Sequence, residues 1–133
     1  MAISKSESAL IEQTLHSIEG LKLAYLFGSR AQGCSTSASD WDIAFLAQKP
    51  MAALDRWELA QALASDLGAD VDLIDLAEAS TVMRMQVVTQ GIRLYGKPYD
   101  ADVFEVQVYS MYGRLQESRE GILQDFIGEL KDE

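Results

Sequence analysis

Short apolar runs alternate with amphipathic helix patterns through residues 1–99, and this alternation limits the possible folds more than any other feature of the chain. Strand length and bounding turn residues mark the runs 21–27, 41–47, 69–76 and 92–95, the last short enough for an edge strand. A Ser4/Glu7 capping box starts the first helix pattern, and Gly68 and Gly91 end two later ones. Helices that alternate with strands around a small sheet predict an α/β or α+β domain.

Residues 100–133 have a different pattern, because apolar side chains recur there at helical spacing without a strand signal: Phe104, Val108, Met111, Leu115, Ile122 and Phe126. One helix of roughly 30 residues would be about 45 Å long, whereas a domain of about 100 residues has a radius of gyration of about 13 Å. Either the helix breaks, at Gly113 or Gly121, or part of its apolar stripe leaves the core and needs a partner. Two helices folded back on the sheet are an equal alternative. We therefore predict one domain, with residues 1–99 as its body and 100–133 as a helical segment and candidate partner interface.

The charge of the chain excludes one class of function. It has 11 Lys and Arg against 21 Asp and Glu, a net charge of −10. Since neutralisation of phosphates by basic side chains supplies most nucleic-acid affinity, we expect no direct contact with nucleic acid. The single cysteine, Cys34, excludes an internal disulfide and a cysteine-based zinc site. Without a signal peptide or an apolar run of roughly 20 residues, the chain is predicted to be cytoplasmic, with no membrane partner.

Acidic residues on two of the predicted strands suggest a metal site. Asp40 and Asp42 flank Trp41, so strand alternation points both carboxylates to one face and the indole to the other. Such a pair is tolerated when a cation lies between the carboxylates or when one keeps its proton. Asp72 lies in the apolar run 71–74, where an unpaired charge is costly. If its strand lies beside that of Asp42, three carboxylates meet and can hold two Mg²⁺ ions, with Asp70 as the alternative third ligand.

The segment Gly28-Ser29-Arg30 follows directly on the first apolar run. Glycine there lets the backbone approach a ligand closely. The amides of Ser29 and Arg30, at the start of a helical turn, can bind phosphates, and the hydroxyl and guanidinium add further donors. A lone Gly-Ser or Asp-x-Asp is usually structural, but their order and strand context together favour a phosphate and metal site.

The sequences of two segments resemble those of a known protein family. Gly-Ser-Arg-Ala-Gln-Gly at 28–33 and Ser-Asp-Trp-Asp-Ile at 39–43 resemble the signature of the DNA polymerase β nucleotidyltransferase superfamily, and the sequence around Asp72 is similar to its third metal-binding acid. The short chain is similar to the minimal nucleotidyltransferase (MNT) branch, many of whose members are antitoxins paired with a HEPN-type ribonuclease toxin. The resemblance implies a nucleotidyltransferase-like fold, a small mixed β-sheet flanked by helices.

The resemblance also implies residue roles and a reaction. Asp40, Asp42 and Asp72 would be the catalytic residues and would hold Mg²⁺, while Gly28 and Ser29 would bind the triphosphate of ATP, together with Arg30. AMP would pass from ATP to a tyrosine hydroxyl of the cognate HEPN toxin and neutralise it. Many relatives carry a basic residue where this chain has Gln32. Two alternatives remain open: an antitoxin that acts by binding and occlusion only, and, ranked last, a small-molecule nucleotidyltransferase of the aminoglycoside type.

Overall fold

The computed structural model describes the backbone of residues 3–36 and 39–131, and side chains as far as Arg119. Helices and strands alternate through the first part of this range, as the sequence predicts. Their bounds are α1 (Lys5–Leu15), β1 (Leu21–Phe27), α2 (Ser29–Gln32), β2 (Trp41–Ala47), α3 (Ala53–Leu67), β3 (Val71–Asp75), α4 (Thr81–Gln90), β4 (Ile92–Tyr95) and α5 (Pro98–Lys131).

The strands form one mixed sheet in the order β3-β2-β1-β4. β1 pairs antiparallel with β2 and with β4, whereas β2 and β3 are parallel and joined by a crossover through α3. The predicted mixed sheet is therefore confirmed, and so is the placement of 92–95 at an edge. The parallel register sets Asp42 opposite Asp72, which fulfils the condition that the sequence left open for a shared acidic site.

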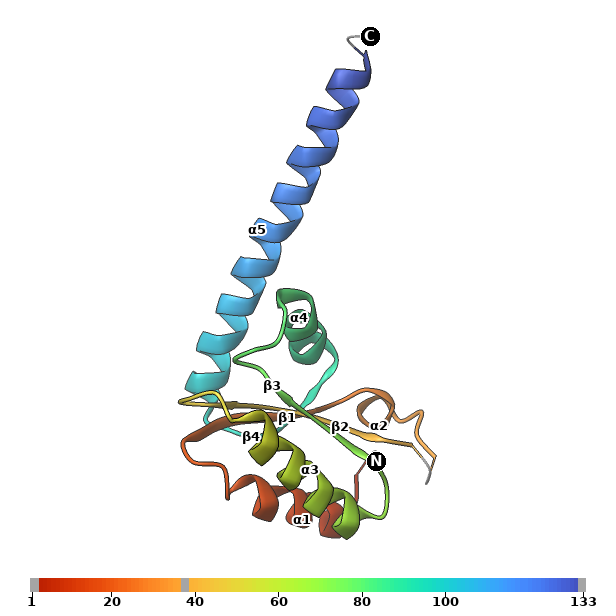
Figure 1. The fold of residues 1–133 in the computed structure, drawn as a ribbon, viewed down its shortest axis with the longest axis vertical. Helices are drawn as coiled ribbons and strands as arrows, with labels where there is room; N and C mark the ends of the chain where they lie inside the picture. The colour runs from red at the N-terminus through yellow and green to blue at the C-terminus, as the bar shows by residue number, and fades with distance from the viewer. Residues whose placement is uncertain (1–2, 37–38, 132–133) are drawn as a thin grey trace.

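Helices cover both faces of the sheet (Figure 1). α1 and α3 lie against one face, where the buried side chains include Trp41, Ile43 and Phe45. α4 and the first turns of α5 lie against the other face, over Tyr25 and Phe27. Because the central strands are buried on both faces, their sequences are apolar without alternation.

Local signals fix the ends of the helices. The Ser4/Glu7 capping box is present: the Ser4 hydroxyl accepts from the Glu7 amide at 3.1 Å and the Glu7 carboxylate accepts from the Ser4 amide at 3.0 Å. Gly68 ends α3 with φ +71°, a left-handed conformation that glycine adopts at low cost. In the described part of the chain, no helix has the length and apolar character needed to cross a bilayer.

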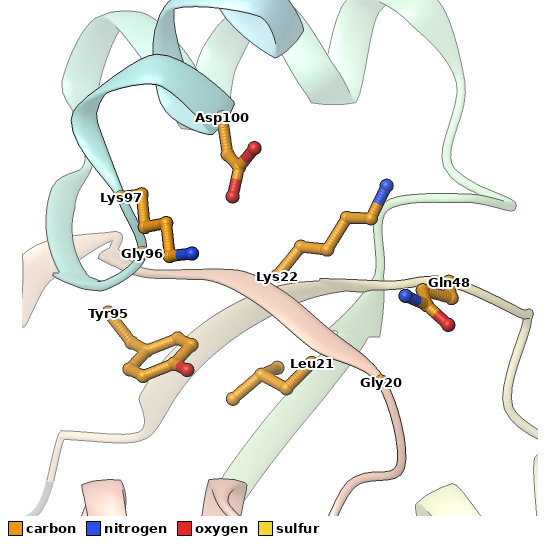
Figure 2. Close-up of a pocket in the computed structure, with 8 residues that line it drawn as sticks. All are labelled: Gly20, Leu21, Lys22, Gln48, Tyr95, Gly96, Lys97 and Asp100. Carbon is orange, nitrogen blue, oxygen red and sulfur yellow. The ribbon is translucent and has the colours of Figure 1, made fainter.

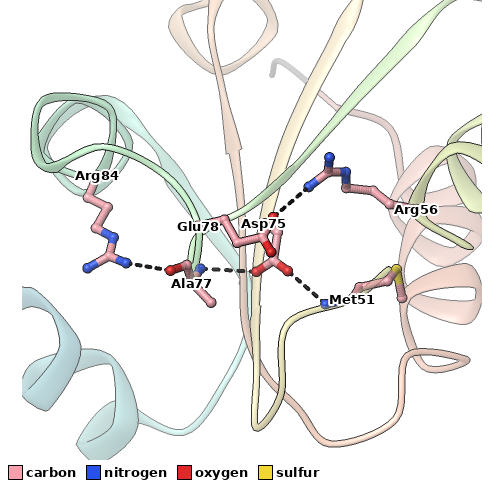
Figure 3. A network of polar contacts seen from close by, with 6 residues as sticks. All are labelled: Met51, Arg56, Asp75, Ala77, Glu78 and Arg84. Atoms are coloured by element: carbon pink, nitrogen blue, oxygen red, sulfur yellow. Dashed lines mark hydrogen bonds and ion pairs between the residues drawn. The ribbon is translucent and has the colours of Figure 1, made fainter. Parts of the chain in front are cut away.

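The loops that follow β2 and β3 are joined by a buried carboxylate (Figure 3). Asp75, only 2% exposed, accepts hydrogen bonds from the amides of Met51 at 2.9 Å and Ala77 at 3.0 Å. Arg84 donates to the carbonyls of Leu76 and Ala77 at 2.7 and 2.9 Å and so ties α4 to the same segment. This network fixes the edge of the sheet where β3 lies.

The C-terminal segment is one continuous helix, α5, which projects far beyond the sheet (Figure 1). The predicted break at Gly113 or Gly121 is therefore wrong, and so is the pair of helices folded back on the sheet. Ala101, Phe104 and Val108 are buried against the body, but Met111, next on the same stripe, is 49% exposed. The stripe thus leaves the core, as the other alternative predicted. The side chains of Ile122 and Phe126 lie outside the described residues.

Candidate active site

Gly28 forms the corner between β1 and the one-turn helix α2. Its backbone has φ +74° and ψ −158°, a region that is essentially restricted to glycine. A Cβ at this position would overlap the carboxylate of Asp42. The register explains this proximity, because Phe27, the last residue of β1, lies opposite Asp42 on β2. Glycine is required here for two independent reasons, and both place the Gly-Ser turn directly beside the acidic residues.

Two of the predicted acids are neighbours across the sheet. Asp42 and Asp72 are register partners on the parallel strands β2 and β3, where adjacent strands lie about 4.8 Å apart. Asp40, just before β2, lies two residues from Asp42 and is exposed, as is Asp72. Burial, followed by the charges of Asp72 and then Asp40, raises the pKa of Asp42. The three carboxylates therefore share one electrostatic environment, in which a cation would relieve their repulsion.

The chemistry of these side chains fits Mg²⁺, since carboxylate oxygens are the ligands that this hard cation takes from proteins. The carboxylates are, however, farther apart than the ligands of a bound metal ion. Among the side chains of residues 3–36 and 39–119, no group of three or more acidic, histidine or cysteine residues lies at metal-binding separation. Assignment of the metal to Asp40, Asp42 and Asp72 therefore stays a prediction, and so does the choice between Asp72 and Asp70, which lies just before β3.

Ser29 occupies the first position of α2, the predicted phosphate-binding turn. The Gly28 carbonyl accepts from the amides of Ala31 and Gln32, both at 3.2 Å, which folds the turn tightly. The first amides of a helix have no acceptor within it, so that of Ser29 remains suited to an anion. Gln32 donates to the Gln90 side chain at 3.1 Å and so connects α2 with α4.

Arg30 was predicted to bind phosphate, a role that needs an accessible guanidinium, but its side chain is buried. The side chain is 7% exposed. Its Nε and Nη2 both donate to the Ser39 carbonyl, at 3.0 and 2.7 Å, and the guanidinium carbon lies 4.1 Å from the centroid of the Trp41 ring. Trp41 is fully buried, as predicted from its position opposite the acids. A phosphate-binding role for Arg30 stays a prediction, while its contacts with the loop before β2 are established.

Two cavities lie at different distances from the acidic residues, and only one of them is lined by a predicted site residue. One, of about 480 Å³, lies at the opposite end of the sheet, between the start of β1 and the start of α5, and includes Lys22, Lys97 and Asp100 (Figure 2). The other, of about 300 Å³, lies along the β3 edge and is lined by Asp72 together with Arg56 and Trp57 of α3. Neither α3 residue could be predicted from the sequence. The apolar spacing of α3 predicts its buried face, but it does not indicate which outward side chains lie beside β3.

The comparison with known protein families agrees with this geometry. A family model described as polymerase beta, nucleotidyltransferase, matches residues 10–100. The chain belongs to the polymerase beta nucleotidyltransferase family. The match includes the Gly-Ser turn and all three acids of this nucleotidyltransferase.

Similar proteins extend the likeness beyond the matched region. Protein adenylyltransferase MntA of Shewanella oneidensis is 48% identical to this nucleotidyltransferase over 92% of the chain and 88% of its own length. A crystal structure of a toxin–antitoxin with AMP-PNP contains a chain that superposes with a TM-score of 0.83 at 48% identity, covering 90% of this chain and 98% of that one. A structure of the tri-AMPylated Shewanella oneidensis HEPN toxin in complex with MNT antitoxin gives a TM-score of 0.79 at 44% identity, with coverage of 96% and 99%.

Proposed function

We propose that this nucleotidyltransferase transfers AMP from ATP to a tyrosine hydroxyl of a cognate HEPN-type toxin and neutralises it as an antitoxin. The observation that carries the proposal is the 48% identity to a protein adenylyltransferase over nearly the whole chain. The reported complexes of similar proteins, one with AMP-PNP and one with an AMPylated toxin, support ATP as the nucleotide and a protein as the acceptor. A protein acceptor also argues against the alternative function, a small-molecule nucleotidyltransferase of the aminoglycoside type. We place this activity in the cytoplasm, where ATP is available.

In the proposed reaction the tyrosine hydroxyl loses its proton to solvent and its oxygen forms a bond to the α-phosphorus of ATP. The bond from that phosphorus to the oxygen bridging the α- and β-phosphates breaks, and pyrophosphate leaves. Gly28 and the amide and hydroxyl of Ser29 bind the phosphates at the end of β1. Asp40, Asp42 and Asp72 would hold Mg²⁺, and the ion would neutralise charge on the phosphates when bound. The parallel register keeps Asp42 and Asp72 side by side, so this part of the site is set by the sheet itself.

The exposed part of α5 is the surface that we assign to the toxin. Its apolar stripe is buried at Val108 but 49% exposed at Met111, so contact with another protein would continue a face that the body covers only in part. The sequence beyond the buried part of the stripe, residues 109–133, holds six acidic residues against three basic ones. This excess of acid favours a partner with a basic surface, as expected for a ribonuclease that binds RNA.

Mass spectrometry of the toxin after incubation with this protein, ATP and Mg²⁺ tests the reaction. We expect increments of one adenylate on a tyrosine, lost in Asp40→Asn, Asp42→Asn and Asp72→Asn. Asp70→Asn is the matched control, an acid beside β3 whose replacement should leave the increments intact. Loss in Asp70→Asn with retention in Asp72→Asn would reassign the third acid. Toxin neutralised in cells by all three acid variants would favour binding and occlusion instead.

Binding is tested separately on α5. Met111→Asp places a charge on the apolar stripe, whereas Ser110→Asp places the same charge on an exposed neighbouring position about 100° around the helix. We expect Met111→Asp to weaken toxin binding by about tenfold or more, the effect of losing one central interface residue, and Ser110→Asp to leave it unchanged. Equal affinities for the two variants, measured by calorimetry, would show that the stripe is not the interface.

A further inference from the structure

The backbone around Asp40 is held from both sides by one side chain. Arg30 reaches from α2 to Ser39, the residue before Asp40, and donates two hydrogen bonds to its carbonyl at 3.0 and 2.7 Å. The same guanidinium lies over the ring of Trp41, the residue after Asp40, at 4.1 Å from the ring centroid. Asp40 itself is exposed. Its position is therefore fixed through its neighbours.

The two anchor points are themselves well held. The Ser39 amide donates to the Thr36 carbonyl at 3.1 Å, and the Ser39 hydroxyl accepts from the Thr36 amide at 2.9 Å, which closes the end of the loop. The Trp41 amide donates to the Asp70 carbonyl at 2.8 Å, where β2 begins to pair with β3. Within the described residues the buried Trp41 Nε1 has no hydrogen-bond partner, so packing and the guanidinium hold the ring.

We propose that Arg30 is a positioning residue for Asp40, and that it fixes this carboxylate through the Ser39 carbonyl and the Trp41 ring. This inference rests on the proposed adenylyl transfer, in which Asp40 is a catalytic residue. A guanidinium suits the task because its Nε–H and Nη2–H converge on the one Ser39 carbonyl oxygen, while the face of the same planar group stacks on the Trp41 indole. A lysine at this position would keep the positive charge but lose both the fork and the stacking.

The two roles considered for Arg30 predict different kinetics. If Arg30 gripped the triphosphate, Arg30→Gln would raise the KM for ATP, and Arg30→Lys, which keeps the charge, would restore much of it. If Arg30 positions Asp40, both variants should lower kcat by about tenfold or more, because a displacement of about 1 Å at a catalytic group can cost up to about a hundredfold. The KM for ATP should then stay within about twofold of the wild-type value.

Arg84→Lys provides a matched control. Arg84 also uses its guanidinium to bind two backbone carbonyls, those of Leu76 and Ala77, but it does so from α4 and away from the acids. Arg84→Lys should lower the melting temperature to a similar extent as Arg30→Lys and leave kcat unchanged. A kcat that falls equally in both variants would mean that Arg30 acts only through general stability, and would overturn the proposal.

A spectroscopic measurement keeps the test independent of turnover. The chain has two tryptophans, Trp41 and the exposed Trp57, so Trp57→Phe leaves Trp41 as the sole emitter beside the site. In that background Arg30→Lys should shift the emission of Trp41, and Arg84→Lys should not. An unchanged spectrum and unchanged kcat in a folded Arg30→Lys protein would refute the positioning role. If Arg30→Lys does not fold, Trp41→Phe replaces the indole under the guanidinium with a smaller ring that holds a cation less strongly. This variant should lower kcat with an unchanged KM, and normal kcat there would refute the positioning role instead. Failure of the wild-type protein to adenylylate the toxin would refute the proposed function itself.

Discussion

Replacement of Gly28 by alanine should separate the catalytic requirement at this corner from its conformational one. The backbone angles, φ +74° and ψ −158°, lie where a residue other than glycine costs about 1–3 kcal/mol. The added Cβ would also overlap the Asp42 carboxylate, so that side chain must move away from its position beside Asp72. We therefore expect Gly28→Ala to lose about 1–3 kcal/mol of unfolding free energy and to lower the rate of adenylyl transfer by about tenfold or more.

Gly68→Ala is the control for backbone strain. Gly68 has φ +71°, ends α3, and would place a Cβ with no atom within 4 Å. Its replacement should cost about 1–2 kcal/mol, as expected for alanine in a left-handed conformation, without affecting the rate. Urea denaturation gives the stability of both variants, and initial rates of toxin adenylylation under conditions where both are folded give the activity. Full activity in Gly28→Ala, or an equal loss in Gly68→Ala, would refute the argument that the Cβ displaces Asp42.

Two further predictions concern buried polar groups. Burial, reinforced by the charge of Glu105, raises the pKa of Tyr25 to about 12, so its phenol stays neutral in the folded protein while it ionises above about pH 10 in the unfolded chain. The stability that this difference in pKa supplies below pH 10 is lost as the pH rises, by about 1 kcal/mol at pH 11. Urea titrations at pH 9 and pH 11 should show this loss in the wild-type protein and not in Tyr25→Phe. An equal loss in both proteins would contradict the raised pKa of Tyr25. Asp75→Ala should cost about 2–4 kcal/mol in the same assay, because the partly buried amides of Met51 and Ala77 lose the buried carboxylate that accepts from them. The exposed Asp66→Ala should cost less than about 0.5 kcal/mol, and similar costs for both variants would show that the amides find water.

The sheet could be predicted well because its signals are local. The strands 21–27 and 41–47 were predicted with the bounds that the structure shows, since glycine or a polar segment borders each apolar run. β3 is shorter than the predicted 69–76 and spans Val71–Asp75. The residues just outside each end still bond to β2: the Asp70 carbonyl accepts from the Trp41 amide, and the Leu76 amide donates to the Phe45 carbonyl. Propensity alone does not distinguish such residues from the strand.

Two features depended on information that the sequence does not carry. The first is the course of the C-terminal helix: apolar spacing left open whether the helix breaks or carries its stripe out of the core, because spacing alone does not show how far the body covers that stripe, and in the structure α5 is continuous with Met111 49% exposed. The second feature is the direction of Arg30. A basic residue after Gly-Ser suggests a phosphate ligand, but in a one-turn helix the side-chain direction depends on how the turn docks on Trp41, a long-range contact. Spacing therefore predicted the acids, whereas the contacts of Arg30 with Ser39 and Trp41 could be seen only in the fold.

The openness of the acidic site affects which acceptors it can use. Asp40 and Asp72 are exposed, and Asp42 is only partly covered, so the carboxylates lie at the rim of the sheet where a bulky acceptor can reach them without any domain closure. Water has the same access, and water competes with an alcohol for an activated phosphoryl group. Under the proposed reaction, the docked toxin would then supply the wall that excludes solvent. This arrangement would link the consumption of ATP to the presence of the toxin, and free tyrosine would be a poor substitute for it.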